Sequence, residues 1–426
     1  MLERLIGFSI RNRAAVVFAV AVLGAVGVYS LGRLPIDAVP DITNNQVQVN
    51  TVVASLSPVE VEKQVTFPIE TALAGIPGLT YTRSLSRNGF SQITAVFEDD
   101  VSIYFARQQV AERIGEVRES LPPDADPRMG AISTGLGEIY MWTVEYEAPE
   151  AGANGEPGPG PQPDGSYLTP EGEHLRTRVE KASYLRTIQD WIIRPQVKSV
   201  KGVAGVDAIG GYVKQYHVQP DPRRLVAHGL TFDDVLEALE KNNRSTGAGY
   251  IEDRGEAYLV RATGRVERAE QIASIVVGER RGTPIYVRDV AWVGIERELR
   301  TGSASENGEE VVVGTALMLI GENSRSVANA VDQKMAEVNK TLPPGVRAKT
   351  VLNRTALVDA TIATVQRNLV EGAVLVIVVL FLLLGNIRAA LITALAIPLS
   401  MLLTATAMVQ TRTSGNLMSL GAIDFG

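Results

Sequence analysis

Three long apolar stretches separate the polar parts of this chain. The first, Ala14–Gly32, has 19 residues and no charge, which is enough to cross a hydrocarbon layer of about 30 Å at about 1.5 Å per helical residue. Two more, within 366–386 and 389–410, follow a long polar segment and are separated by a very short loop. We predict three membrane-spanning helices, the last two forming a tight hairpin.

Basic residues predict the orientation of these helices. Arg4, Arg11 and Arg13 precede the first stretch and Arg388 lies in the short loop, and cytoplasmic loops are enriched in such residues. The N-terminus is therefore expected in the cytoplasm and the long polar segment outside it. A cleavable signal peptide is the alternative, but the apolar run is long for one and no small-x-small cleavage site follows. An uncleaved anchor is favoured within 1–35, whose first residues suit an amphipathic helix on the inner membrane face.

A fourth apolar stretch, 417–426, contains the acid Asp424. This residue follows Leu417 by seven positions, which places it roughly 10 Å into the membrane. Carboxylates are costly there and are kept mainly for proton or ion pathways. We predict a proton relay at Asp424, with burial against a structural partner as the alternative. Because the sequence stops at Gly426, inside this stretch, we expect it to be a portion of a longer transporter.

The long polar segment alternates short strand and helix patterns. Residues 46–121 are typical of a strand, a helix, a hairpin turning at Asn88-Gly89 and a second helix. The pattern recurs from Ile139, with strands on either side of Gly210-Gly211, and a third copy begins at Val311. Such units make ferredoxin-like subdomains. The predicted fold class is therefore an α+β membrane protein: transmembrane helices plus a large insert of repeated β-α-β subdomains. The expected strands are 46–54, 79–86, 90–98, 139–145, 203–209, 212–218 and 311–320, and the expected helices are 58–73, 103–121, 185–200, 231–241 and 326–342.

Two further segments of the polar region have distinctive patterns. Half of the residues in 149–170 are Pro or Gly, which predicts a flexible or polyproline-like insertion loop and not a core element. Residues 250–263, preceded by two glycines, are typical of a hairpin that projects as an arm, or of an ordinary surface hairpin.

The composition argues against several classes of function. With no cysteine there are no disulfides, thiolate zinc sites or thiol catalysts, and a net charge of −7 gives no support to nucleic-acid binding. The three histidines are not at metal-ligand spacing, and neither a phosphate-binding loop nor a nucleophile elbow is present. An enzyme is therefore not expected and no cofactor is predicted. The energy source of a pump is better sought in Asp424 than in a nucleotide.

Three motifs resemble one transporter superfamily. They are Leu34–Ile42 (LPIDAVPDI) directly after the first apolar stretch, Pro68-Ile69-Glu70, and Ser419–Gly426 (SLGAIDFG). In order and over the whole chain, the sequence resembles the resistance-nodulation-division (RND) efflux superfamily, and most closely its heavy-metal branch of the cobalt–zinc–cadmium resistance pump type. The resemblance implies a proton-driven antiporter of the Gram-negative inner membrane that exports a divalent metal ion: zinc, cobalt, cadmium or nickel.

The same resemblance implies an organisation and partners. Residues 36–125 would form a first porter subdomain, 126–210 with 281–345 a second, and 211–280 a docking subdomain inserted in it. The 250–263 hairpin would belong to an arm between subunits. The protein would be a homotrimer in membrane lipid with a large periplasmic domain, working with a periplasmic adaptor protein and an outer-membrane channel.

Three acids are candidate site residues by this resemblance. Asp424 matches the first acid of the fourth-span motif in divalent-metal members. Glu138, in GLGEI, and Asp190, in QDW, match acidic positions that line the periplasmic metal pocket, where oxygen ligands suit borderline divalent ions. The alternative is that Glu138 only ends a loop before a strand and that Asp190 makes a helix-surface ion pair.

Other functions compete with divalent-metal export. A drug- or amphiphile-exporting member of the superfamily is disfavoured because aromatic residues make up only 6% of the chain. A copper or silver exporter is disfavoured because such members tend to lack the acid that Asp424 matches. A receptor or assembly factor would bind a partner with its external domains, but it needs no acid at membrane depth.

Overall fold

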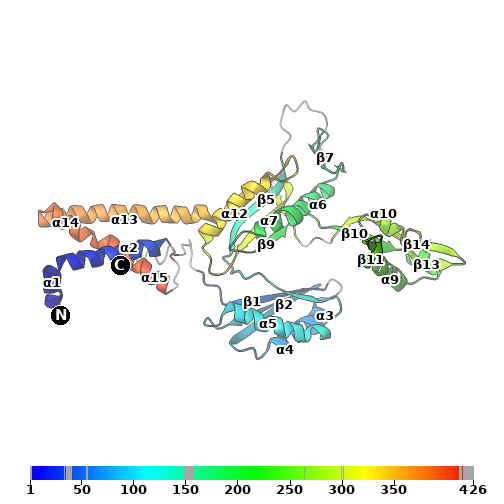
Figure 1. Cartoon of the computed structure of the whole chain (residues 1–426), viewed down its shortest axis with the longest axis horizontal. Coiled ribbons are helices and arrows are strands. Elements are labelled where there is room, and N and C mark those ends of the chain that lie inside the picture. The colour runs from blue at the N-terminus through cyan, green and yellow to red at the C-terminus, as the bar shows by residue number, and fades with distance from the viewer. Residues whose placement is uncertain are drawn as a thin grey trace. The chain divides into compact units, whose positions relative to one another are not determined.

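The chain folds into two compact units (Figure 1). Unit 1 contains Met1–Glu147, Asp190–Ala208 and Val313–Gly426, and unit 2 contains Ala148–Gln189 and Ile209–Val312. The structure is a computed structural model that describes residues 2–32, 34, 41–53, 56–147, 158–262, 264–298, 300, 302–411 and 415. Each unit is described by itself below.

Unit 1 contains the apolar helices. Among the described residues, three helical ranges are long and apolar enough to cross a membrane: Arg13–Leu31, Arg354–Leu383 and Leu391–Gln410. Each of the three predicted spans overlaps one of these ranges and extends beyond it by one to three residues. These ranges fall on α2 (Arg13–Leu31), α13 (Arg354–Leu384, the long orange helix in Figure 1), α14 (Ile387–Ala394) and α15 (Ala396–Gln410). A shorter helix, α1 (Leu2–Arg11), precedes α2.

Helix α13 begins well before the predicted span 366–386. The side chain of Asn353 accepts a hydrogen bond from the backbone N–H of Thr355 at 2.9 Å, which caps the first turn. At the other end, Gly385 has a left-handed φ of 59° and donates its N–H to the carbonyl of Phe381 at 2.9 Å. The apolar pattern marked only the second part of α13, because polar residues alternate with apolar ones between Arg354 and the start of the predicted span.

The third apolar stretch forms two helices and not one. Helix α14 ends at Ala394 and α15 begins at Ala396. Pro398 has no N–H to bond the carbonyl of Ala394, and its ring crowds that carbonyl. Pro398 therefore accounts for the interruption of the helix at Leu395.

Helices α2 and α15 pack closely at Gly27. A Cβ atom on Gly27 would lie 2.4 Å from the Cβ of Leu402, whereas one on Gly24 would lie 3.8 Å from Cδ2 of Leu399. We expect Gly27→Ala to force the helices apart at a cost of roughly 1–3 kcal/mol, lowering the thermal unfolding midpoint of the detergent-solubilised protein. Gly24→Ala is the matched control and should leave that midpoint almost unchanged. Equal midpoints for the two variants would contradict this packing.

A four-stranded antiparallel sheet forms one part of unit 1. Its elements are β1 (Gln46–Val52), α3 (Pro58–Val61), η1 (Glu62–Thr66), α4 (Phe67–Leu73), β2 (Leu79–Arg87), β3 (Phe90–Phe97), α5 (Ile103–Val117), η2 (Arg118–Ser120) and β4 (Asp126–Met129). The strand order is β2-β3-β1-β4. The hairpin between β2 and β3 turns at Asn88-Gly89 as predicted, with Gly89 at a φ of 68°. Val47 and Val49, alternate residues of β1, share a buried core with Ile69 of α4.

A second sheet in the chain has five strands. Its elements are β5 (Glu138–Tyr146), β9 (Val203–Ile209), β16 (Ala304–Glu306), β17 (Glu309–Met318) and β18 (Val346–Asn353), and the neighbouring helices in sequence are α6 (Arg178–Ile188), η3 (Gln189–Ile193), α7 (Arg194–Lys198) and α12 (Ser324–Asn339). The order is β16-β17-β5-β18, with β9 paired to β17. The prediction of a third copy beginning at Val311 is therefore wrong. The strand that contains Val311, β17, pairs with β5 and completes the second sheet.

Two helices widen into a π-helical segment just before a proline. Segment η1 is followed by Phe67-Pro68, and η3 by Arg194-Pro195. Proline has no N–H for the regular i−4 bond, and the N–H of Phe67 reaches the carbonyl of Glu62 instead. Such segments are frequent at functional sites, and Asp190 is part of η3.

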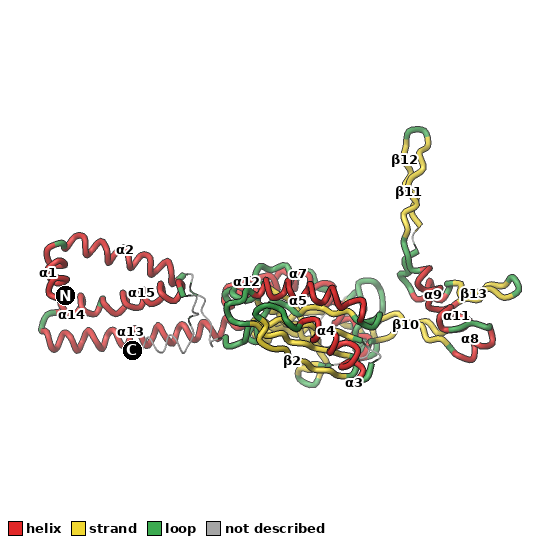
Figure 2. Tube along the Cα trace, turned by 90° about the horizontal axis from the view of Figure 1, so that it is seen from below, coloured by secondary structure: helices red, strands yellow, loops and turns green. Residues whose placement is uncertain are grey.

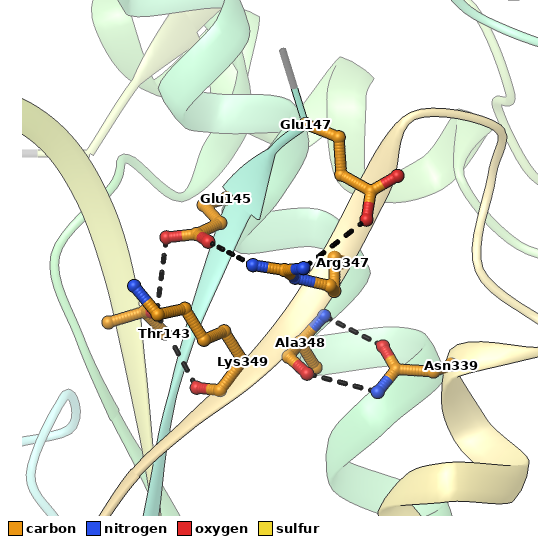
Figure 3. A network of polar contacts seen from close by, with 7 residues as sticks. All are labelled: Thr143, Glu145, Glu147, Asn339, Arg347, Ala348 and Lys349. Atoms are coloured by element: carbon orange, nitrogen blue, oxygen red, sulfur yellow. Dashed lines mark hydrogen bonds and ion pairs between the residues drawn. The ribbon is translucent and has the colours of Figure 1, made fainter. Parts of the chain in front are cut away.

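Polar contacts join β18 to the C-terminal end of β5 and to α12 (Figure 3). Arg347 on β18 pairs with Glu145 (Nη2–Oε1, 3.1 Å) and with Glu147 (Nη1–Oε1, 3.7 Å). The amide of Asn339, which ends α12, donates to the carbonyl of Ala348 at 3.0 Å and accepts its N–H at 2.8 Å. Because Arg347 forms ion pairs with both Glu145 and Glu147, we interpret these two carboxylates as stabilising the sheet and not as metal ligands.

Most of unit 2 is built from short hairpins and helices. Its elements are β10 (Lys214–Pro220), α8 (Pro222–His228), α9 (Phe232–Asn242), β11 (Thr246–Asp253), β12 (Glu256–Ala262), α10 (Ala269–Ala273), β13 (Val276–Arg280), β14 (Thr283–Tyr286), α11 (Val287–Val290) and β15 (Ala291–Arg297). The strands on either side of Gly210-Gly211 have different partners: β9 pairs with β17 and β10 with β15. The predicted 250–263 hairpin is β11–β12, which begins earlier and extends away from α9 and β13 in Figure 2. Thr263 lies outside the described residues.

Part of the predicted flexible loop 149–170 instead belongs to a small three-stranded sheet. It contains β6 (Gly160–Pro161), β7 (Tyr167–Leu168) and β8 (His174–Leu175). The carboxylate of Asp164 accepts the N–H of Ser166 at 2.9 Å and its hydroxyl at 2.6 Å, and Tyr167 is buried with its ring 5.5 Å from that of Tyr184. The prediction was wrong for these residues because a count of Pro and Gly does not detect an Asx turn or a buried tyrosine. Residues 148–157 lie outside the described residues.

Candidate functional site

Glu138 lies where a fixed loop enters the second sheet. It is the first residue of β5 and is exposed. In the loop before it, Gly137 donates its N–H to the carbonyl of Thr134 at 2.9 Å, and the carbonyl of Gly137 accepts the N–H of Met318 on β17 at 2.7 Å. The backbone at Glu138 is therefore held in place while its carboxylate faces the surface.

Two other parts of unit 1 hold the same loop. Arg354, the first residue of α13, donates from Nη1 to the carbonyl of Leu136. Thr43, in the segment before β1, accepts the N–H of Gly135 on its Oγ1 at 3.2 Å. The loop that leads to Glu138 is thus bonded both to the segment before β1 and to the start of α13.

The carboxylate of Asp41 lies among these contacts. We call Asp41, Thr43, Thr134 and Arg354 the Asp41 cluster. Oδ1 of Asp41 accepts the N–H of Thr43 at 3.0 Å. Burial raises the pKa of the Asp41 carboxyl, but hydrogen bonds from Thr134 and Thr43 and the charge of Arg354 lower it, so that the net pKa is below the usual value. At neutral pH the cluster therefore combines a carboxylate with a guanidinium.

Asp190 has a cationic partner on its own helix. Its Oδ1 lies 2.9 Å from Nη2 of Arg194, four residues further along, and its side chain is only 16% exposed. This is the ion pair that was the alternative to metal binding. A role as metal ligand stays a prediction for Asp190, and a metal ion would have to compete with Arg194 for the carboxylate.

The predicted ligands do not form a complete metal site. In the part of the chain that the structure describes, no group of three or more His, Cys, Asp or Glu side chains is placed to hold a metal ion. Zinc is usually held by three or four protein ligands. Glu138 and Asp190 could therefore supply only part of a site.

The remaining predicted site residue, Asp424, lies outside the described residues, as does the whole of 417–426. The same holds for 35–40, the centre of the Leu34–Ile42 motif. Proton transfer at Asp424 stays a prediction.

The role of Arg354 was missed by sequence reasoning. Asp41 was noticed as part of a motif, but Arg354 is one of many arginines in polar sequence, and 218 positions separate it from Leu136. The Asn353 cap marks a helix start there. Nothing in the local pattern indicates which carbonyl Arg354 would meet.

Comparisons with known proteins agree over the whole chain. A sequence model of the AcrB/AcrD/AcrF family matches residues 5–426. The chain is 56% identical to the nickel-cobalt-cadmium resistance protein NccA of Alcaligenes xylosoxydans xylosoxydans and 55% identical to the cobalt-zinc-cadmium resistance protein CzcA of Cupriavidus metallidurans. Both alignments cover 100% of this chain, but only 40% and 38% of those proteins. The chain thus spans about two fifths of the length of these relatives.

More distant relatives show the same coverage. The cation efflux system protein CusA of Escherichia coli K12 is 33% identical over 99% of this chain and 38% of its own length. An X-ray structure of a heavy metal efflux pump superposes with a TM-score of 0.81 at 31% identity, covering 99% of this chain and 39% of that one.

Proposed function

Because this chain belongs to the AcrB/AcrD/AcrF family of the RND efflux superfamily, we propose that the protein exports divalent heavy-metal ions in exchange for protons. The substrate would be zinc, cobalt, cadmium or nickel. One observation carries this proposal: the chain is 54–56% identical, over its whole length, to proteins named for resistance to nickel, cobalt, cadmium or zinc.

Asp424 is the proposed proton carrier. An acid at membrane depth is expensive unless it serves a pathway for protons or ions. Protonation from the outer side and release to the cytoplasm would drive the conformational cycle that moves the metal outward. The proposed proton site would then lie in the membrane, and the proposed metal site in the folded segment outside it.

Glu138 is the proposed first metal contact. Its carboxylate is exposed at the end of a loop that is held on three sides, which suits an oxygen ligand for a borderline divalent ion. Asp190 would join it when a metal ion competes with Arg194 for the carboxylate. Further ligands would come from elsewhere in the full-length protein.

The boundaries of the proposed subdomains differ from those of the observed sheets: β4 (Asp126–Met129) pairs with β1, β18 (Val346–Asn353) with β5, and β10 with β15, each across or beyond a proposed boundary. Residues 36–125 would be a first ferredoxin-like porter subdomain, which the antiparallel pairing of β2 with β3 and of β3 with β1 supports. Residues 126–210 with 281–345 would be a second, which the pairing of β17 with β5 supports. Residues 211–280 would form the docking subdomain, with the β11–β12 hairpin as an intersubunit arm.

The proposed assembly is a homotrimer in the Gram-negative inner membrane. Among the described residues, three helical ranges of spanning length support membrane insertion, and the long folded segment between α2 and α13 supports a large periplasmic domain. A periplasmic adaptor and an outer-membrane channel would complete the export path.

Metal tolerance tests this proposal. The full-length protein would be produced with its adaptor and channel in a Gram-negative host that lacks its own metal exporters. We expect higher tolerance to, and lower cell content of, at least one of Zn²⁺, Co²⁺, Cd²⁺ and Ni²⁺. Tolerance to Cu⁺ alone would identify a copper exporter, and tolerance to dyes or detergents alone would identify a drug or amphiphile exporter.

A further inference from the structure

The loop that carries Glu138 is bonded to the start of a helix that continues into the apolar part of unit 1. Arg354 opens α13, which runs for 31 residues to Leu384 without a described interruption. Its guanidinium donates to the carbonyl of Leu136, two residues before Glu138. One side chain therefore connects the proposed metal contact to a candidate membrane helix.

We propose that Arg354 is a positioning residue for metal binding at Glu138. It fixes the Thr134–Glu138 loop and transmits a displacement of α13 to that loop. This inference rests on the proposed metal contact at Glu138 and adds to it the residue through which the membrane helix controls that contact.

The position of Arg354 is itself well fixed. Asn353 caps the first turn of α13 through Thr355, and Val358 on the next turn is fully buried. The charge of Arg354 is balanced by Asp41, whose pKa it helps to lower. A guanidinium held in this way cannot follow the loop independently, so a shift of α13 moves the loop with it.

A second arginine contact to the same helix provides a control. Arg325 on α12 pairs with Asp359 of α13 (Nε–Oδ1, 2.8 Å), and about half of each side chain is exposed. This pair also places a guanidinium beside the first turns of α13. Its acceptor, however, is the carboxylate of Asp359 on the helix and not a carbonyl of the loop before Glu138. Replacing Arg325 removes the same charge without releasing the loop.

Partners that orient a metal ligand typically contribute tenfold to a hundredfold in affinity. We therefore expect Arg354→Ala to weaken Zn²⁺ binding by about tenfold or more. Arg354→Lys should restore part of the affinity, because an ammonium keeps the charge and one donor. Arg325→Ala should bind Zn²⁺ like the wild type.

The test is a double-mutant cycle on the full-length protein in lipid nanodiscs, with Zn²⁺ affinity measured by calorimetry. The variants are Glu138→Gln, Arg354→Ala, the two combined, Arg354→Lys and Arg325→Ala. Hydrogen exchange at the amides of 135–138 is measured in parallel without metal. We expect faster exchange only in the two variants that carry Arg354→Ala. Adding Arg354→Ala to Glu138→Gln should cause no further loss of Zn²⁺ affinity.

The outcomes separate this inference from the function on which it rests. Wild-type Zn²⁺ affinity in Arg354→Ala, alongside weakened binding in Glu138→Gln, would overturn the positioning role and leave the metal contact intact. Equal losses from Arg354→Ala in both backgrounds would also overturn it, because the arginine would then act independently of Glu138. Unchanged affinity in Glu138→Gln would remove the metal contact itself, and the inference with it.

Discussion

Asp424→Asn in the full-length protein is expected to abolish proton-coupled metal export. Asparagine has nearly the size of aspartate and can still form hydrogen bonds, but it cannot take up and release a proton. The cycle would therefore lose its proton-carrying step while the protein still folds and forms trimers. The measurement is the pH change inside proteoliposomes when Zn²⁺ is added, which should fall to the level of liposomes without protein.

Two controls make the Asp424 result specific. Asp424→Glu keeps a carboxylate and should retain part of the flux, and size-exclusion chromatography should give the same elution for all three proteins. Wild-type flux in Asp424→Asn would contradict the relay. A variant that loses its trimer would instead support the alternative of a buried structural acid.

Glu138→Gln is expected to weaken Zn²⁺ binding by about tenfold or more, equivalent to about 1.4 kcal/mol or more. The amide keeps the shape of the side chain but loses the negative charge that attracts a divalent ion. The passive proton conductance of the proteoliposomes should not change, because the site lies outside the membrane helices. Calorimetry and the proton-flux measurement report the two quantities separately.

Glu147→Gln is the matched control for Glu138→Gln. It makes the same chemical change just beyond the opposite end of β5, about 30 Å away at about 3.3 Å per strand residue. Glu147 has Arg347 as its ion-pair partner, so its loss should leave Zn²⁺ affinity unchanged. Equal affinities for Glu138→Gln and the wild type would remove Glu138 from the metal site.

The sequence predicted individual helices and hairpins better than it predicted which distant strands pair with one another. The β2–β3 hairpin was recognisable because Asn88-Gly89 favours a turn that needs a positive φ. The helix α9 was recognisable because Thr231 caps it through Asp234. The pairing of β17 with β5 was not recognisable from the sequence. Residues 147–308 separate the two strands, and no local pattern indicates that both belong to one sheet.

The candidate site shows the same limit. The position of Glu138 at the end of a loop before a strand and an ion pair of Asp190 on its helix are local features, and both were expected from the sequence. The bond from Arg354 to the carbonyl of Leu136 depends on the folding of the whole unit. Every residue has a backbone carbonyl, so the residue type does not indicate which carbonyl accepts a hydrogen bond from a distant side chain.

Metal uptake into inside-out vesicles tests proton-driven export of divalent metals most directly. The vesicles carry the full-length protein and are given Zn²⁺, Co²⁺, Cd²⁺, Ni²⁺ or Cu⁺ with an imposed pH gradient. We expect uptake of at least one divalent ion that stops when a protonophore collapses the gradient. Uptake that persists after the gradient is collapsed, or no uptake of any divalent ion, would contradict a proton/divalent-metal antiporter.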